Sequence, residues 1–151
     1  MEATELMIGD WVAYDGQPNI VRQLGIYGTD RDGDDYPAVC VGKPNGVGLI
    51  LERNEIEPIP LTSEILVRNG FVLNRESPLL KEYICALGDS PDNNLFVSIY
   101  GKSLSDNRDF VKVCYCPLGT SEMIDVNIQH CAVHQLQHAL RLCGIDKTIK
   151  L

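Results

Sequence analysis

The chain has 151 residues, of which 44% are hydrophobic and 23% are charged, and its formal net charge is -8. This composition excludes an intrinsically disordered chain, and the length suits one domain or two small lobes that share a core. Residues 1–11 contain acids but no base, and no apolar run approaches the length of a membrane span. We therefore expect a cytoplasmic protein that carries no signal peptide and does not enter a membrane.

The negative charge is concentrated in the first part of the chain. Residues 1–60 contain 4 Lys+Arg and 11 Asp+Glu, a net charge of -7, whereas residues 61–151 contain 9 and 10, a net charge of -1. Nucleic-acid binders draw most of their affinity from basic side chains that neutralise phosphates. We therefore expect an as yet unknown protein partner rather than nucleic acid, and an acidic, solvated face on the first part.

Turn residues divide the first part into short apolar runs, a pattern typical of a small β-structure. Strands are expected at residues 20–27, 37–41 and 47–51. The two prolines of residues 56–61 suit an edge strand or a connector, and residues 28–36 suit an acidic loop. The opening GDWV segment, followed by a turn and a strand, is typical of SH3-like barrels. We therefore predict an SH3-like β-barrel lobe over residues 1–61.

The second part, residues 62–151, combines helices with strands. Thr62 and Glu64 suit the start of a short helix that ends at Gly70. A longer helix is expected over residues 129–144, with Gly144 as its left-handed cap. Its apolar stripe consists of Val133, Leu136, Leu140 and Cys143. Strands are expected at residues 71–73, 83–87, 95–100, 110–115 and 123–128.

These elements predict an α+β fold. The SH3-like barrel is followed by a helix, an antiparallel sheet and an amphipathic C-terminal helix that covers the sheet. We expect the barrel lobe and the α+β lobe to pack as one compact unit.

Three blocks of the sequence carry a resemblance to a known group. ELMIGDWV near the start, IEPIPLTSEILVRNGF in the middle and VHQLQHALRLCG near the end together resemble small uncharacterised proteins of Bacteroides-type gut bacteria and their prophages and mobile elements. The resemblance implies a related fold and a mobile-element origin, and it implies no activity. The chain departs from the group in extra turn sequence before Val47, in His130 and His138, and in several cysteines.

The best candidate for metal chemistry is a row of histidines. His130, His134 and His138 recur every four residues, a spacing that places them on one helix face, and Cys114 and Cys116 form a CxC pair on a predicted strand. These five side chains are candidate zinc ligands. The alternative is a solvent-facing histidine stripe with buried structural thiols, because the histidines flank the apolar stripe rather than join it.

Two further patterns imitate functional sites. Residues 30–35 place acids at positions one, three and five of a calcium-like loop, but position six is Asp35 instead of glycine and position twelve is Val41 instead of glutamate. The six cysteines lack both an export signal and a local nucleophile motif, so we interpret them as reduced core thiols rather than as disulfides or catalytic groups.

No phosphate-binding loop, nucleophile elbow or dinucleotide fingerprint is present in the sequence. We therefore expect a non-enzymatic protein without a cofactor, which acts as an interaction or accessory module in a phage or mobile-element setting. Small barrels present grooves and loops to partners, and Tyr14, Tyr27 and Tyr36 are the candidate contact residues. Trp11 is expected to belong to the core. The alternative function is zinc binding by the histidines and the CxC pair.

Overall fold

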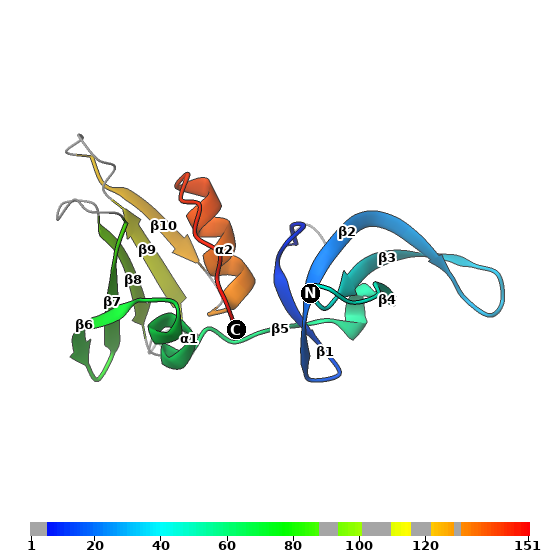
Figure 1. Cartoon of the computed structure of the whole chain (residues 1–151), viewed down its shortest axis with the longest axis horizontal. Helices are drawn as coiled ribbons and strands as arrows, with labels where there is room; N and C mark the ends of the chain where they lie inside the picture. The colour runs from blue at the N-terminus through cyan, green and yellow to red at the C-terminus, as the bar shows by residue number, and fades with distance from the viewer. Residues whose placement is uncertain (1–5, 88–93, 101–109, 116–121, 129–130) are drawn as a thin grey trace. The chain divides into compact units, whose positions relative to one another are not determined.

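The protein consists of two units, each built around its own antiparallel sheet. The computed structural model describes residues 6–87, 94–100, 110–115, 122–128 and 131–151, and the chain divides into unit 1, Met1–Ile59, and unit 2, Pro60–Leu151 (Figure 1). Two sheets and two helices make the fold α+β. None of the helices in the described ranges is long and apolar enough to cross a membrane.

In its described residues, unit 1 has five strands and one short 3-10 helix. The strands are β1 (Trp11–Tyr14), β2 (Gln17–Thr29), β3 (Asp35–Gly42), β4 (Leu49–Glu52) and β5 (Glu57–Pro58), and the helix is η2 (Arg53–Glu55). They pair antiparallel in the order β4-β3-β2-β1-β5. Within the described residues β4 and β5 remain the two edges of the sheet, so this sheet is open.

A turn followed by a buried aspartate starts unit 1. Gly9 has a positive φ of 90°, which glycine adopts without steric cost. The carboxylate of Asp10 is buried and accepts a hydrogen bond of 2.6 Å from the backbone N–H of Met7. The backbone N–H of Val21 donates to the carbonyl of Asp10. The GD pair of the GDWV segment is therefore structural, and it leads Val12 into the core.

The core of unit 1 is formed by aliphatic side chains from β1 to β4 and from the segments just before β1 and β5. Its buried members are Leu6, Val12, Val21, Val39, Val41, Leu51 and Ile56. Trp11, expected in the core, is half-buried.

The β2–β3 hairpin is longer than the sequence predicts. Residues 28–36 are not a loop, because Gly28 pairs with Tyr36 and Thr29 pairs with Asp35, which leaves only residues 30–34 as the turn. The ring of Tyr36 fills the space that a side chain at Gly28 would take, since a Cβ placed there would lie 2.3 Å from Tyr36 Cζ. An aromatic ring over a cross-strand glycine lets the strands continue where glycine alone suggests a loop.

Unit 2 is a five-stranded meander with two helices. The strands β6 (Val72–Ser77), β7 (Leu80–Ala86), β8 (Asn94–Tyr100), β9 (Phe110–Tyr115) and β10 (Ile124–Ile128) pair in the order β10-β9-β8-β7-β6. This confirms the predicted antiparallel sheet. The helices α1 (Ser63–Arg68) and α2 (Val133–Leu142) lie on the same side of the sheet (Figure 1).

The helix ends follow the local signals in the sequence. Thr62 caps α1 by accepting a hydrogen bond of 3.4 Å from the backbone N–H of Ile65. Gly70 and Gly144 follow α1 and α2 with φ values of 82° and 70°, as expected for left-handed caps. α2 starts at Val133 rather than at residue 129, because Ala132 is extended and forms a β-bridge with Pro60.

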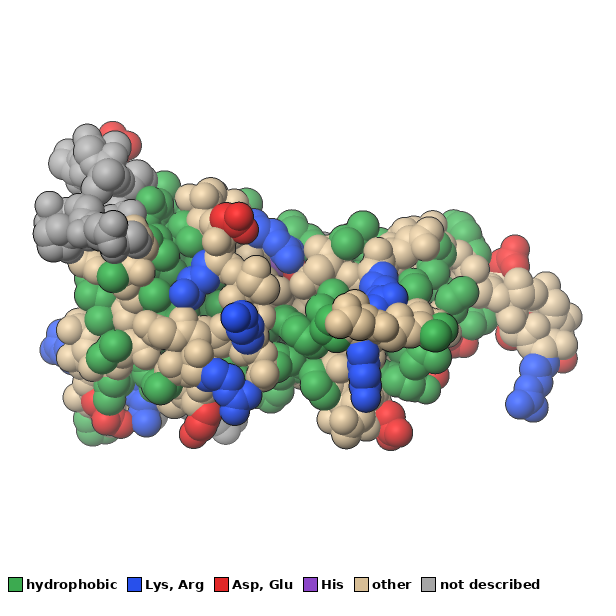
Figure 2. Space-filling view, in the orientation of Figure 1, with side chains coloured by type: hydrophobic (Ala, Val, Ile, Leu, Met, Phe, Trp, Pro, Cys, Tyr) green, Lys and Arg blue, Asp and Glu red, His purple; other side chains and the backbone are tan. Residues whose placement is uncertain are grey.

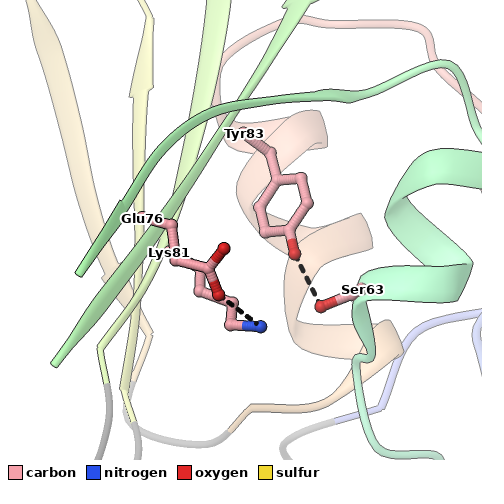
Figure 3. Close-up of polar contacts among 4 residues, drawn as sticks. All are labelled: Ser63, Glu76, Lys81 and Tyr83. Atoms are coloured by element: carbon pink, nitrogen blue, oxygen red, sulfur yellow. Dashed lines mark hydrogen bonds and ion pairs between the residues drawn. The ribbon is translucent and has the colours of Figure 1, made fainter. Parts of the chain in front are cut away.

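Polar contacts join α1 to the sheet and link β6 to β7. The hydroxyl of Tyr83 on β7 donates a hydrogen bond of 2.6 Å to the Ser63 hydroxyl at the start of α1 (Figure 3). Lys81 and Glu76, paired across β7 and β6, form an ion pair of 3.0 Å. This ion pair is exposed, so it contributes little to stability.

The middle block of the resemblance contacts the residues just before the last block, within unit 2. The backbone N–H of Leu61 donates a hydrogen bond of 2.9 Å to the carbonyl of Cys131, next to the bridge between Pro60 and Ala132. The thiol of Cys131 lies 3.3 Å from the carbonyl of Leu61. The IPLT segment thus holds the chain just before α2.

Candidate protein-interaction groove

The structure places the three candidate tyrosines in three different environments. Tyr14 is half-buried and packs against the core of unit 1. Tyr27 is 71% exposed, whereas Tyr36 is half-buried over Gly28. Tyr27 pairs with Pro37, one position from the pair of Gly28 with Tyr36, so the rings of Tyr27 and Tyr36 lie on opposite faces of the hairpin. One flat partner surface does not contact both rings.

A groove of about 850 Å³ lies beside Tyr36. It is formed where the end of the β2–β3 hairpin meets β4 and η2. The lining residues that bear on its chemistry are Thr29, Asp30, Tyr36, Ile50, Glu52 and Glu55. Tyr36, Ile50 and Glu52 share one face of the sheet, because Ile50 and Glu52 pair with alternate residues of β3 that follow Tyr36.

Three carboxylates of the groove are held by backbone hydrogen bonds. Asp30 Oδ1 accepts from the backbone N–H groups of Asp32 and Asp34, both at 2.9 Å. Glu55 Oε2 accepts from the backbone N–H of Glu52 at 2.7 Å, and the Glu52 side chain accepts from the backbone N–H of Glu55. This reciprocal capping box fixes both side chains, and each carboxylate keeps lone pairs for a further donor.

The groove is predominantly acidic. The ion pairs of the structure, Lys81 with Glu76 and Lys112 with Asp125, both belong to unit 2. Within the described residues, therefore, no groove carboxylate is neutralised by a salt bridge. Arg31 is the basic member of the lining, opposite three acids. Charged side chains also gather at the tip of the β2–β3 hairpin (Figure 2).

The histidines do not form the expected solvent-facing stripe. His134 is only 2% exposed, and the ring of His138 meets it edge-on at 5.8 Å between centroids. The buried positions of α2 include His134, Gln137 and Ala139 in addition to three of the four predicted stripe residues, so this helix is covered on more than one side. His130 and Cys116 lie outside the described residues.

Cys114 lies on the other face of the sheet from these histidines. Val113 lies in the same cross-strand row as Tyr83, and the hydroxyl of Tyr83 contacts α1, so this row faces the helices. Successive side chains on a strand point to opposite faces, and Cys114 follows Val113 on β9. Cys114 therefore points away from the helices. Burial and a hydrogen bond with Asp125 raise the pKa of the Cys114 thiol to about 11. The thiol stays protonated at neutral pH, which disfavours both metal ligation and nucleophilic attack.

No cluster of three metal-ligating side chains exists among the described residues. This covers the acidic turn of residues 30–34 as well as His134, His138 and Cys114. Asp30 uses its carboxylate to hold its own turn, which is the ordinary role of an aspartate in a tight loop. The described cysteines form no disulfide; Cys85 is buried and the others are half-buried.

Ile50, Glu52 and Glu55 are not among the site residues that the sequence predicts. Glu52 and Glu55 have the spacing of a capping box, but Glu52 is not one of the residue types that mark an N-cap in a sequence. Their meeting with Tyr36 depends on the register of β3 against β4, which the sequence does not encode locally. Comparison of the chain with protein-family models, curated proteins and solved structures finds no match.

Proposed function

We propose that the chain is a non-enzymatic protein-interaction module and that the groove of unit 1 is its contact surface. The observation that carries this proposal is the combination of the Tyr36 ring, fixed over Gly28, with Ile50, which is 57% exposed beside it. Aromatic and aliphatic side chains surrounded by polar groups are the usual anatomy of a protein interface.

Unit 1 belongs, in this proposal, to the SH3-like domains. Supporting this are the strand order β4-β3-β2-β1-β5, in which the last strand returns to the first, and the 3-10 helix between the last two strands. Such domains bind partner segments in grooves between their loops. The three sequence blocks that resemble the Bacteroides-type group are the ground on which we place the module in the cytoplasm of a mobile-element setting.

The tyrosine pair offers a matched test of this proposal. Tagged protein is used to capture partners from cells of its source, with the variants Tyr36→Ala and Tyr27→Ala alongside the parent chain. A partner that is retained by the parent chain and by Tyr27→Ala, but lost from Tyr36→Ala, supports the groove. Since the two rings lie on opposite faces, equal retention by all three proteins contradicts the proposal.

A further inference from the structure

We propose that the groove of unit 1 receives a lysine- or arginine-bearing segment of the partner protein. This inference rests on the proposed function and names the chemistry of the segment that is bound. The groove combines two features that a cationic side chain can use at once. One is an aromatic ring in a fixed position, and the other is a set of anchored carboxylates.

The carboxylates are placed to accept from a donor outside the chain. Asp30, Glu52 and Glu55 are each fixed by backbone N–H groups, and in the described part of the chain none of them has an ion-pair partner. Because backbone hydrogen bonds already order these side chains, a bound cation does not have to restrict their rotamers. A preorganised acceptor loses less entropy on binding than a mobile surface glutamate does.

The ring of Tyr36 supplies the second feature. Its position over Gly28 leaves no room for a Cβ beneath it, which limits the motion of the ring. A guanidinium or ammonium group above a tyrosine face is attracted by the ring quadrupole, and the aliphatic stem of the same residue can lie along Ile50. Arginine fits best, since its planar fork both stacks on the ring and pairs with a carboxylate.

The same features disfavour other ligand classes. Unit 1 as a whole is acidic, so a phosphate backbone is repelled. A bare metal ion finds no group of three ligating side chains within the described residues. Charge complementarity therefore leaves a basic protein segment as the occupant.

The test uses a fluorescein-labelled peptide of four Arg-Thr repeats and the full chain. A peptide in which citrulline replaces every arginine keeps the shape and removes the charge. Binding is followed by fluorescence anisotropy at 0.15 M salt, where the Debye length is about 8 Å and distant charges contribute little. The first chain variant is the double substitution Glu52→Gln and Glu55→Gln, which retains the capping box because the glutamine side chain also accepts backbone hydrogen bonds. Asp15→Asn with Glu57→Gln removes the same charge outside the groove lining.

The arginine peptide is expected to bind the parent chain, and the citrulline peptide is not. The groove double variant should weaken binding by roughly fivefold to thirtyfold, as for two exposed ion pairs. The control double variant should weaken binding clearly less than the groove double variant does, because neither Asp15 nor Glu57 lines the groove. Tyr36→Phe should bind like the parent chain, whereas Tyr36→Leu should lose about twofold to fivefold.

Three results would overturn this inference. They are an absence of arginine-peptide binding, equal binding of the citrulline peptide, and equal losses in the two double variants. The proposed function is tested separately, by the capture experiment with Tyr36→Ala. If a captured partner requires Tyr36 but competes with neither peptide, the chain is an interaction module whose groove does not bind a basic segment.

Discussion

Replacement of Asn69 by alanine should loosen the C-terminal tail of unit 2. The amide nitrogen of Asn69 donates to the carbonyls of Ile65 and Lys150, and its Oδ1 accepts from the backbone N–H of Lys150, each at 2.7 Å. One hydrogen bond contributes about 0.5–1.5 kcal/mol net to stability. In the variant, water can form hydrogen bonds with the exposed backbone of Lys150 in place of Asn69. We therefore expect the loss of the three bonds to cost about 2 kcal/mol in total. The tail should stay attached, because Ile149 is fully buried and contributes a similar amount.

This loss is measured by urea unfolding, followed by far-UV circular dichroism, of the parent chain and of Asn69→Ala. Asn69→Asp keeps the acceptor for the Lys150 N–H but places a carboxylate oxygen against the carbonyls of Ile65 and Lys150 at the C-terminal end of α1, so its loss should be at least as large. Hydrogen exchange of the Lys150 amide should become faster in Asn69→Ala. A change in the free energy of unfolding below about 0.5 kcal/mol, with the Lys150 amide still protected, would refute the assignment of the tail's stability to these bonds.

Three further predictions follow from the packing and the charges. Gly28→Ala should displace the Tyr36 ring, cost about 1–2 kcal/mol of stability as an overpacked contact, and weaken partner binding; unchanged tyrosine ring NMR shifts would contradict it. Leu136→Ala should cost about 3 kcal/mol by leaving a cavity under the fully buried side chain, as measured by thermal unfolding. Hydrogen bonds from Cys114 and Lys112 lower the pKa of Asp125 in the folded protein. The stabilisation that Asp125 gives the folded state is therefore fully present above its unfolded pKa of about 4, and it is lost as the pH falls through the lower folded pKa. The stability difference between the parent chain and Asp125→Asn should therefore vanish in acid, and a difference that persists at low pH would contradict it.

The parts of the fold that depend on neighbours in the sequence were predictable. Thr62, Gly70 and Gly144 have the capping roles that their positions predict, because a cap is formed within one turn of the chain. The meander of unit 2 was also predictable, since each of its strands pairs with the next one along the chain. Closure of the first sheet into a barrel was predicted on less local evidence, and the described sheet is open.

The parts that depend on distant residues were not predictable. The loop predicted at residues 28–36 is wrong because a cross-strand partner, Tyr36, compensates for Gly28. The prediction of a solvent-facing histidine stripe is wrong at His134, which is buried. The periodic pattern predicts one buried stripe, whereas α2 is buried on more than one side. The groove itself requires β4 and the hairpin end to meet, a matter of register that no single motif encodes.

Site-specific photo-cross-linking can show whether the groove beside Tyr36 is the partner surface. A benzophenone side chain is introduced at Ile50, which lines the groove, or at Val67, which lies on α1. The two positions are matched in exposure at 57% and 58%. In cells of its source, the chain labelled at Ile50 should yield a discrete protein adduct that disappears with Tyr36→Ala, and the chain labelled at Val67 should not. Adducts of equal yield at both positions, or an Ile50 adduct that survives Tyr36→Ala, would show that the groove is not the partner surface.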